Sequence, residues 1–221
     1  MNPILNPDCQ EVWSTIDPYI VRVFHPFLKL ELFSELRSEF PDIRELRTRR
    51  GVGYKHGVSD GKRGGFRELI EHRPSLAYFH NAIVNRALLK FARRHFNVLR
   101  GASLKQRVEL SLLPSNGGHV RPHPDMEKKL VTLVIYLADD DWNASWGGEF
   151  AMVKPLVPVD TGEGYRISFD DVVVVHKVPF KPNIAVFMER SPCSFHAVYP
   201  IRAPEGRHRK SITINFMGRP R

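Results

Sequence analysis

Two histidines and one aspartate have the residue types and spacing of a metal site. His123 and Asp125 form an H-x-D motif within residues 117–125. On an extended segment, residues two apart point to the same face, so an imidazole nitrogen and a carboxylate oxygen can reach one metal ion. An H-x-D alone is common by chance, but a further histidine, His196, follows late in the chain between apolar, strand-like residues. The pattern predicts a metal site with His123, Asp125 and His196 as ligands.

Two histidines and one carboxylate are the facial triad of non-haem iron(II) sites, which leaves three coordination positions open for a co-substrate and oxygen. Thirteen residues after His196 comes Arg209, at the start of a strand-like run that also contains Ser211 and Thr213 on the same face. A guanidinium beside the metal suits bidentate binding of a carboxylate. Arg209 therefore predicts a carboxylate-bearing co-substrate.

The elements that must position these residues differ between the two halves of the chain. Residues 105–218 contain short β-branched or aromatic runs separated by Pro, Gly, Asn and Asp, which predicts a β sandwich or barrel. The expected strands are 107–113, 130–137, 149–153, 172–178, 183–189, 194–200 and 210–216.

Residues 1–100 have a mainly helical pattern. Apolar residues recur at helical spacing over 27–40 and again over about 75–95. Between them, residues 51–65 are rich in Gly, Lys and Asp, which predicts a loop. The loop is either a flexible connection without a function of its own or a lid that faces the substrate. We expect one domain over 1–221, with a helical N-terminal support over 1–104 and a catalytic β core over 105–221.

The C-terminal half resembles the prolyl 4-hydroxylase-like branch of the iron(II)/2-oxoglutarate-dependent dioxygenases. The resemblance rests on motifs that stand in order at the family's spacing, and any one of them alone would be weak. They are residues 113–118 (LPSNGG), 132–137 (TLVIYL), 146–150 (WGGEF), 183–187 (NIAVF), 194–198 (SFHAV) and 209–213 (RKSIT). It implies a mainly β fold with N-terminal helices (α+β) and a double-stranded β-helix core, a jelly-roll, cupin-like architecture.

The resemblance also implies roles for individual residues. His123, Asp125 and His196 would bind iron, and Arg209 would bind the distal carboxylate of 2-oxoglutarate. Tyr136 matches the position that hydrogen-bonds the same carboxylate. Thr132 and Ser211 are expected to line that co-substrate pocket. Leu113 departs from the pattern, because some relatives carry a tyrosine there that contacts the co-substrate.

The implied activity is hydroxylation of an unactivated C–H bond in an amino-acid, peptidyl or small natural-product substrate. The co-substrates would be 2-oxoglutarate and O2, the products would include succinate and CO2, and ascorbate is a candidate reductant. Halogenating relatives replace the carboxylate ligand with a small residue, so the retained Asp125 favours hydroxylation or a related oxidation.

Net charge and cysteine content limit the classes of binding partner and the cellular compartment that we expect. The formal net charge is +9 with a pI near 9.8, which favours an acidic or carrier-bound substrate. No zinc finger or RNA-recognition signature accompanies the basic residues, which argues against nucleic acid. The two cysteines, the missing signal peptide and the missing apolar span predict a cytoplasmic protein without a membrane anchor.

Two alternative functions stay open, a non-catalytic cupin-like protein that binds a metal or ligand, and a nucleic-acid-acting oxygenase. Other residues have ordinary interpretations beside the functional ones. His119 is either a neighbour of the site or a turn residue, and His176 is expected to be a strand histidine. Trp142 and Trp146 could stack on a substrate or pack against the protein interior. Gly147-Gly148 predicts a tight turn, and the three aspartates at 139–141 predict a turn exposed to solvent.

Overall fold

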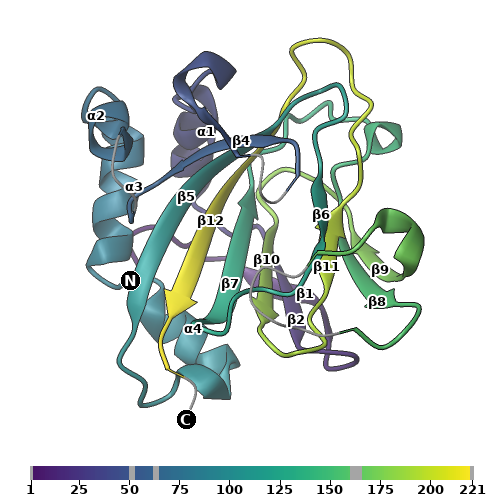
Figure 1. Ribbon diagram of the computed structural model, residues 1–221. Coiled ribbons are helices and arrows are strands. Elements are labelled where there is room, and N and C mark those ends of the chain that lie inside the picture. Colours follow the sequence, from purple (N-terminus) through teal and green to yellow (C-terminus); the bar gives the residue numbers. More distant parts are fainter. Residues whose placement is uncertain (1, 50–52, 62–64, 160–165, 220–221) are drawn as a thin grey trace.

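The computed structural model describes residues 2–49, 53–61, 65–159 and 166–219. Two β-sheets face each other, and helices cover the outer side of the larger one (Figure 1). The large sheet has the strand order β1 (Gln10–Thr15), β2 (Val21–His25), β10 (Ala185–Glu189), β7 (Lys129–Tyr136), β12 (Arg209–Met217), β5 (Lys105–Leu113), β4 (Lys55–Ser59), β3 (Arg47–Arg49). The small sheet has the order β6 (Val120–His123), β11 (His196–Val198), β8 (Phe150–Pro155), β9 (Val172–Val178).

The helices are α1 (Leu30–Ser38), α2 (Phe66–Glu71), α3 (Pro74–Val84) and α4 (Leu89–His95). Short 3-10 turns occupy Ile43–Glu45, Asn97–Leu99, Ala144–Trp146 and Phe169–Asp171. Within the described ranges, no helix combines the length and the apolar character needed to cross a membrane.

The outer face of the large sheet is apolar and packs against the helices. Alternate residues of its central strands are almost fully buried in one cluster with the apolar sides of α1, α3 and α4. The strand residues in this cluster include Val108, Leu110, Leu112, Leu133, Ile135, Ile212, Ile214 and Phe216. Full burial of each such side chain stabilises the fold by about 1.5–3 kcal/mol, so this face is the main source of stability.

The inner face of the same strands is largely polar. Antiparallel register places Arg209 opposite Leu113, Ser211 opposite Ser111 and Tyr136, and Thr213 opposite Glu109. A second apolar cluster that contains Tyr136, Phe150, Phe180 and Val186 fills one end of the space between the sheets. The space between the sheets is therefore bordered by a polar wall over β5 and β12 and by an apolar cluster at one end.

The helix predicted over 27–40 is shorter in the structure because its first residues are extended. The Leu28 backbone N–H donates to the Asn183 side-chain oxygen at 2.8 Å, and the Asn183 side-chain nitrogen donates to the Leu28 carbonyl at 2.8 Å. These bonds hold residue 28 against the sheet, so α1 starts at Leu30. The helix predicted over 75–95 is divided into α3 and α4, because Arg86 adopts a left-handed backbone with φ of 64°.

The prediction that the first hundred residues are mainly helical was wrong for the segments that form the four strands β1 to β4. β1 and β2 extend the large sheet beyond β10, and β3 and β4 extend it beyond β5. β4 falls inside the predicted loop 51–65, of which residues 51–52 and 62–64 lie outside the described residues. These strands were missed because β1 is an exposed edge strand and β4 carries only one large apolar side chain, Val58. The boundary at residue 104 stays a prediction.

The strands predicted in the C-terminal half are confirmed as β5, β7, β8, β9, β10, β11 and β12, with ends shifted by up to a few residues. The mainly β architecture with flanking helices is likewise confirmed. The short strand β6 was not predicted, because its sequence contains Pro122 and has little apolar character.

Candidate metal centre

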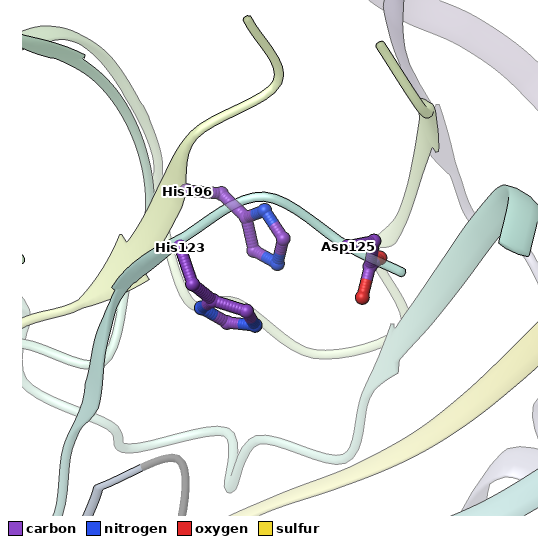
Figure 2. Close-up of side chains that lie close together, drawn as sticks. All are labelled: His123, Asp125 and His196. Atoms are coloured by element: carbon purple, nitrogen blue, oxygen red, sulfur yellow. The ribbon is translucent and has the colours of Figure 1, made fainter. Parts of the chain in front are cut away.

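The two histidines of the predicted triad face each other across two paired strands. β6 and β11 are antiparallel neighbours, and His123 stands directly opposite His196 in their register. Their ring centroids lie 4.5 Å apart. Asp125 follows β6 on the connection to β7, and its carboxylate points toward both rings (Figure 2). One candidate ligand atom from each of the three residues lies within 4.8 Å of the others, a spacing that one metal ion spans with small side-chain rotations.

Hydrogen bonds orient both imidazole rings for binding a cation. Nδ1 of His123 lies 2.7 Å from the Arg121 carbonyl, and Nδ1 of His196 lies 3.1 Å from the Ser194 carbonyl. A carbonyl oxygen only accepts, so each Nδ1 carries the proton and each Nε2 keeps its lone pair. The His196 ring is further held by stacking on Phe150, with centroids 5.5 Å apart.

Both carboxylate oxygens of Asp125 receive hydrogen bonds. Lys129 Nζ donates to Oδ1 at 2.5 Å, and Thr132 Oγ1 donates to Oδ2 at 2.6 Å. The Thr132 oxygen also lies 3.1 Å from the side-chain oxygen of Asn215. Asp125 and Thr132 are both buried, so these short, charge-assisted bonds fix the direction of the carboxylate.

Burial and neighbouring charges set the protonation of the triad. Burial, with a contribution from the neighbouring His196, lowers the pKa of His123 to about 3. Burial likewise lowers the pKa of His196. Burial opposes ionisation of Asp125, but the charges of Lys129, His196 and His123 outweigh it and hold the pKa of that carboxyl well below its usual range. At neutral pH the site therefore offers two neutral imidazoles and one carboxylate.

This donor set fits iron(II). Neutral imidazole nitrogens and a carboxylate oxygen suit first-row divalent metals, and two histidines with one carboxylate leave open positions on the ion. The fit rests on the two Nε2 lone pairs and on the negative charge of Asp125, which Thr132 orients.

Arg209 lies on the inner face at the start of β12 and is buried. Its Nε donates to the Gly148 carbonyl at 2.6 Å, and one terminal nitrogen donates to Ser211 Oγ at 3.2 Å. Its guanidinium carbon lies 5.0 Å from the ring centroid of Tyr136 and 4.8 Å from that of Phe180. The guanidinium is thus positioned between aromatic rings as a preformed anion site.

Tyr136 and Gly148 complete the surroundings of that guanidinium. The Tyr136 hydroxyl accepts a bond from the Phe150 backbone N–H at 3.1 Å, and burial raises the pKa of Tyr136 to about 12. Burial lowers the pKa of Arg209, but a guanidinium stays charged in proteins. Gly148 has a left-handed φ of 95°, and a Cβ there would come within 3.4 Å of Arg209 Cδ. The predicted Gly147-Gly148 turn therefore gives Arg209 both its space and a carbonyl acceptor.

Thr132 shares a face of β7 with Tyr136, as expected, and its hydroxyl donates to Asp125. Its contact with the co-substrate stays a prediction. Ser211 stands opposite Tyr136, and its hydroxyl accepts a bond from Arg209. This position agrees with the expectation that Ser211 lies near the co-substrate carboxylate.

The other singled-out residues lie outside the triad. His119 Nδ1 donates to the Gly117 carbonyl at 2.8 Å, and the ring borders a hollow of about 450 Å³, with Tyr54 and Arg121 among the lining residues. His176 stacks on Trp13 with centroids 4.0 Å apart. Trp142 donates to the Gly147 carbonyl and packs on Phe180.

Several residues at the site carry no signal in the sequence. Lys129 follows Asp125 by four positions, and Asn215 precedes the end of β12, but neither belongs to a motif. The contact of Lys129 with Asp125 is local, four positions along the chain. The role of Asn215 depends on the register between β7 and β12, in which Asn215 stands opposite Thr132, so it could be found only after the strand pairing was known.

The profile of the 2OG-Fe(II) oxygenase superfamily matches residues 108–217, which run from β5 through β12. No curated protein sequence matches this chain significantly. The matched segment contains the triad, Tyr136 and Arg209.

Solved structures share the fold at low sequence identity. A prolyl-4-hydroxylase from Pseudomonas putida is 19% identical with a TM-score of 0.52, and the alignment covers 90% of this chain and 92% of that one. A prolyl hydroxylase from Trichoplax adhaerens, in complex with a hypoxia inducible factor peptide fragment, is 14% identical with a TM-score of 0.58 and coverages of 90% and 83%. The carbocyclase SnoK of nogalamycin biosynthesis is 14% identical with a TM-score of 0.54 and coverages of 90% and 82%. The predicted jelly-roll core is confirmed.

Proposed function

We propose that this chain, which belongs to the 2OG-Fe(II) oxygenase superfamily, hydroxylates an unactivated C–H bond with release of succinate and CO2. As a 2-oxoglutarate-dependent dioxygenase, it uses iron(II), 2-oxoglutarate and O2. The observation that carries the proposal is the presence of the His123–Asp125–His196 cluster and the buried Arg209 guanidinium in one interior.

His123, Asp125 and His196 are the proposed iron ligands. Their Nδ1–H bonds to backbone carbonyls leave each Nε2 available. Thr132 holds Oδ2 of Asp125 and Lys129 holds Oδ1, so the carboxylate would bind the metal through a remaining lone pair. When bound, iron(II) supplies the oxygen-activating chemistry through its open positions. The chain itself orients the ligands and supplies one negative charge.

Arg209 is the proposed site for the distal carboxylate of 2-oxoglutarate. Its Nε is committed to Gly148, so its terminal nitrogens are the groups that turn to a carboxylate. Ser211 Oγ bonds one of these nitrogens, and the Tyr136 hydroxyl lies on the same inner face. Burial excludes water from this end, which strengthens the ionic contact.

Hydroxylation is proposed over halogenation because Asp125 occupies the carboxylate position, so no room is left there for a halide. The substrate is proposed to be an amino-acid, peptidyl or small natural-product molecule. Two of the similar structures support both kinds, since the Trichoplax enzyme was solved with a peptide fragment and SnoK belongs to nogalamycin biosynthesis. Ascorbate is proposed as the reductant that restores iron(II) after unproductive turnover.

The test is oxygen-dependent conversion of 2-oxoglutarate to succinate by the iron-loaded protein. We expect slow turnover even without a primary substrate, loss of turnover in His123→Ala, and loss under nitrogen. Absence of succinate in iron-loaded, folded protein would overturn the proposal. It would leave a cupin-like metal-binding protein as the alternative, for which Arg209→Ala has little effect on ligand binding.

A further inference from the structure

A hollow of about 450 Å³ lies where the edges of the two sheets meet. The large sheet ends at β4 and β3, and the small sheet ends at β6, the strand that carries His123. The two edges are joined by the His119 backbone N–H, which donates to the Tyr54 carbonyl at 3.1 Å. The described residues that line the hollow come from both edges and are Thr48, Gly53, Tyr54, His56, His119 and Arg121.

The connection between β3 and β4 packs tightly against the start of β6. Gly53 has a left-handed φ of 138°, and a Cβ at this position would clash with the His119 carbonyl. Only glycine combines this backbone conformation with so close an approach. The hydrogen bond from His119 to Tyr54 holds the same contact, so the walls of the hollow are fixed without a ligand.

The charge in the hollow is positive. None of the described lining residues is acidic, whereas Arg121, His56 and His119 are basic. Arg121 is exposed, and within the described ranges its guanidinium makes no ion pair and no side-chain hydrogen bond. A guanidinium stays charged in proteins and presents several donors in a planar fork. Arg121 therefore gives the hollow a positive charge that no neighbouring carboxylate neutralises.

The two imidazoles add further polar atoms. His119 Nδ1 donates to the Gly117 carbonyl at 2.8 Å, which leaves its Nε2 for a ligand. Nδ1 of His56 is buried and has no hydrogen-bond partner among the described residues. An unpaired buried nitrogen costs free energy, and a rotation of the ring would turn it to a ligand in the hollow. The hydroxyls of Thr48 and Tyr54 supply neutral donors beside these rings.

The hollow adjoins the metal centre along β6. Arg121 precedes His123 by two residues, and its carbonyl accepts the bond from His123 Nδ1 at 2.7 Å. The Cα atoms of residues two apart on a strand are separated by about 6.6 Å. A molecule with one end at Arg121 therefore needs the length of only a small metabolite to reach the triad.

We propose, resting on the hydroxylase function above, that this hollow binds the phosphate group of the primary substrate, a small phosphate monoester. Such a group carries about −1.5 to −2 charges at neutral pH and three strong acceptor oxygens. The Arg121 fork binds two of these oxygens, and the rings of His56 and His119 are placed for the third. The formal net charge of +9 attracts a dianion of this kind to the protein.

A carboxylate fits the hollow less well. It has one negative charge and two oxygens, which the guanidinium fork of Arg121 alone would occupy. The ring nitrogens of His56 and His119 would then stay without a partner. A peptidyl substrate without an acidic side chain would bring only neutral amides and leave the Arg121 charge uncompensated. The number of basic groups thus favours the dianion.

The test uses full-length protein loaded with Mn²⁺ and 2-oxoglutarate under anaerobic conditions and titrated with methyl phosphate. We expect saturable binding in calorimetry and broadening of the ³¹P resonance by the neighbouring Mn²⁺. Dimethyl phosphate and acetate carry one charge each and should bind at least ~5-fold more weakly. Binding of either compound as tight as that of methyl phosphate would overturn the assignment to a monoester.

Substitutions locate the phosphate. Arg121→Gln should weaken binding of methyl phosphate at least ~10-fold and remove the broadening. His56→Phe keeps a ring of similar shape and should weaken binding about fivefold. The matched control Arg67→Gln removes an exposed arginine on α2 and leaves the affinity unchanged. Wild-type affinity in Arg121→Gln, or broadening that persists in this variant, would place the anion elsewhere and overturn the inference.

These binding measurements do not depend on turnover. If the iron-loaded protein forms succinate but methyl phosphate does not bind, this inference fails while the proposed function stands. Methyl phosphate binding at Arg121 without any succinate formation would overturn the proposed function, and with it the role of the hollow in substrate binding, but not its affinity for phosphate.

Discussion

Replacing Thr132 with valine removes one hydrogen bond to a metal ligand without changing the shape of the side chain. The Thr132 hydroxyl lies 2.6 Å from Asp125 Oδ2, and both residues are buried. A hydrogen bond to a charged group contributes about 1.5–3 kcal/mol. Loss of contacts that orient a metal ligand typically weakens metal binding ~10–100-fold. We expect Thr132→Val to raise the dissociation constant for Mn²⁺, an inert substitute for iron(II), within that range.

The assay is anaerobic titration calorimetry with Mn²⁺, together with the KM for 2-oxoglutarate at saturating iron(II). Thr132→Ser keeps the hydroxyl and should stay within about threefold of the wild type. A residue that lines the co-substrate pocket would instead raise the KM for 2-oxoglutarate and leave Mn²⁺ affinity unchanged. If Thr132→Val binds Mn²⁺ as tightly as the wild type, the positioning role of Thr132 is refuted.

Three further predictions concern the co-substrate end and pH. Arg209→Met should raise the KM for 2-oxoglutarate at least ~30-fold with metal affinity unchanged in calorimetry; unchanged KM would contradict the anion site. Tyr136→Phe should raise that KM about tenfold, the equivalent of one hydrogen bond, as measured in initial-rate assays. The pKa of His123 is lowered to about 3 by burial, whereas an unfolded histidine titrates near 6.5. The unfolded chain therefore binds more protons below that pH, so denaturation of metal-free protein should show full stability above pH 6.5 and a decline as pH falls toward 3. A free energy of unfolding independent of pH over this range would contradict the burial of a neutral His123.

The triad could be predicted because its chemistry lies in residue types and in a spacing of two. His123 and Asp125 need only an extended segment to share a face, and the structure provides one at the end of β6. His196 could be selected among ten histidines because apolar strand residues surround it. The structure brings all three together, although their role as ligands stays a proposal.

The direct opposition of His123 and His196 could not be predicted. It depends on the register of β6 with β11, strands more than seventy positions apart in the sequence, and β6 lacks an alternating apolar pattern. The hydrogen bond from Thr132 to Asp125 could not be predicted for the same reason. Thr132 shares its strand face with Tyr136 but lies four residues nearer to Asp125 in the sequence. Sequence spacing gives the face of a strand, whereas the partner on that face is set by tertiary pairing.

The N-terminal strands were missed for a different reason. Val21 and Val23 pack between the sheets, but the run is only five residues long and precedes a strongly helical pattern.

Titration of 2-oxoglutarate into anaerobic protein, with and without Mn²⁺, tests most directly whether the triad and Arg209 form one co-substrate site. We expect Mn²⁺ to increase the affinity for 2-oxoglutarate at least ~30-fold, since chelation adds to the Arg209 contact. Asp125→Ala should abolish the increase that depends on Mn²⁺, and Arg209→Met should weaken binding in both conditions. Equal affinity with and without Mn²⁺, or an increase that survives in Asp125→Ala, would contradict a shared site.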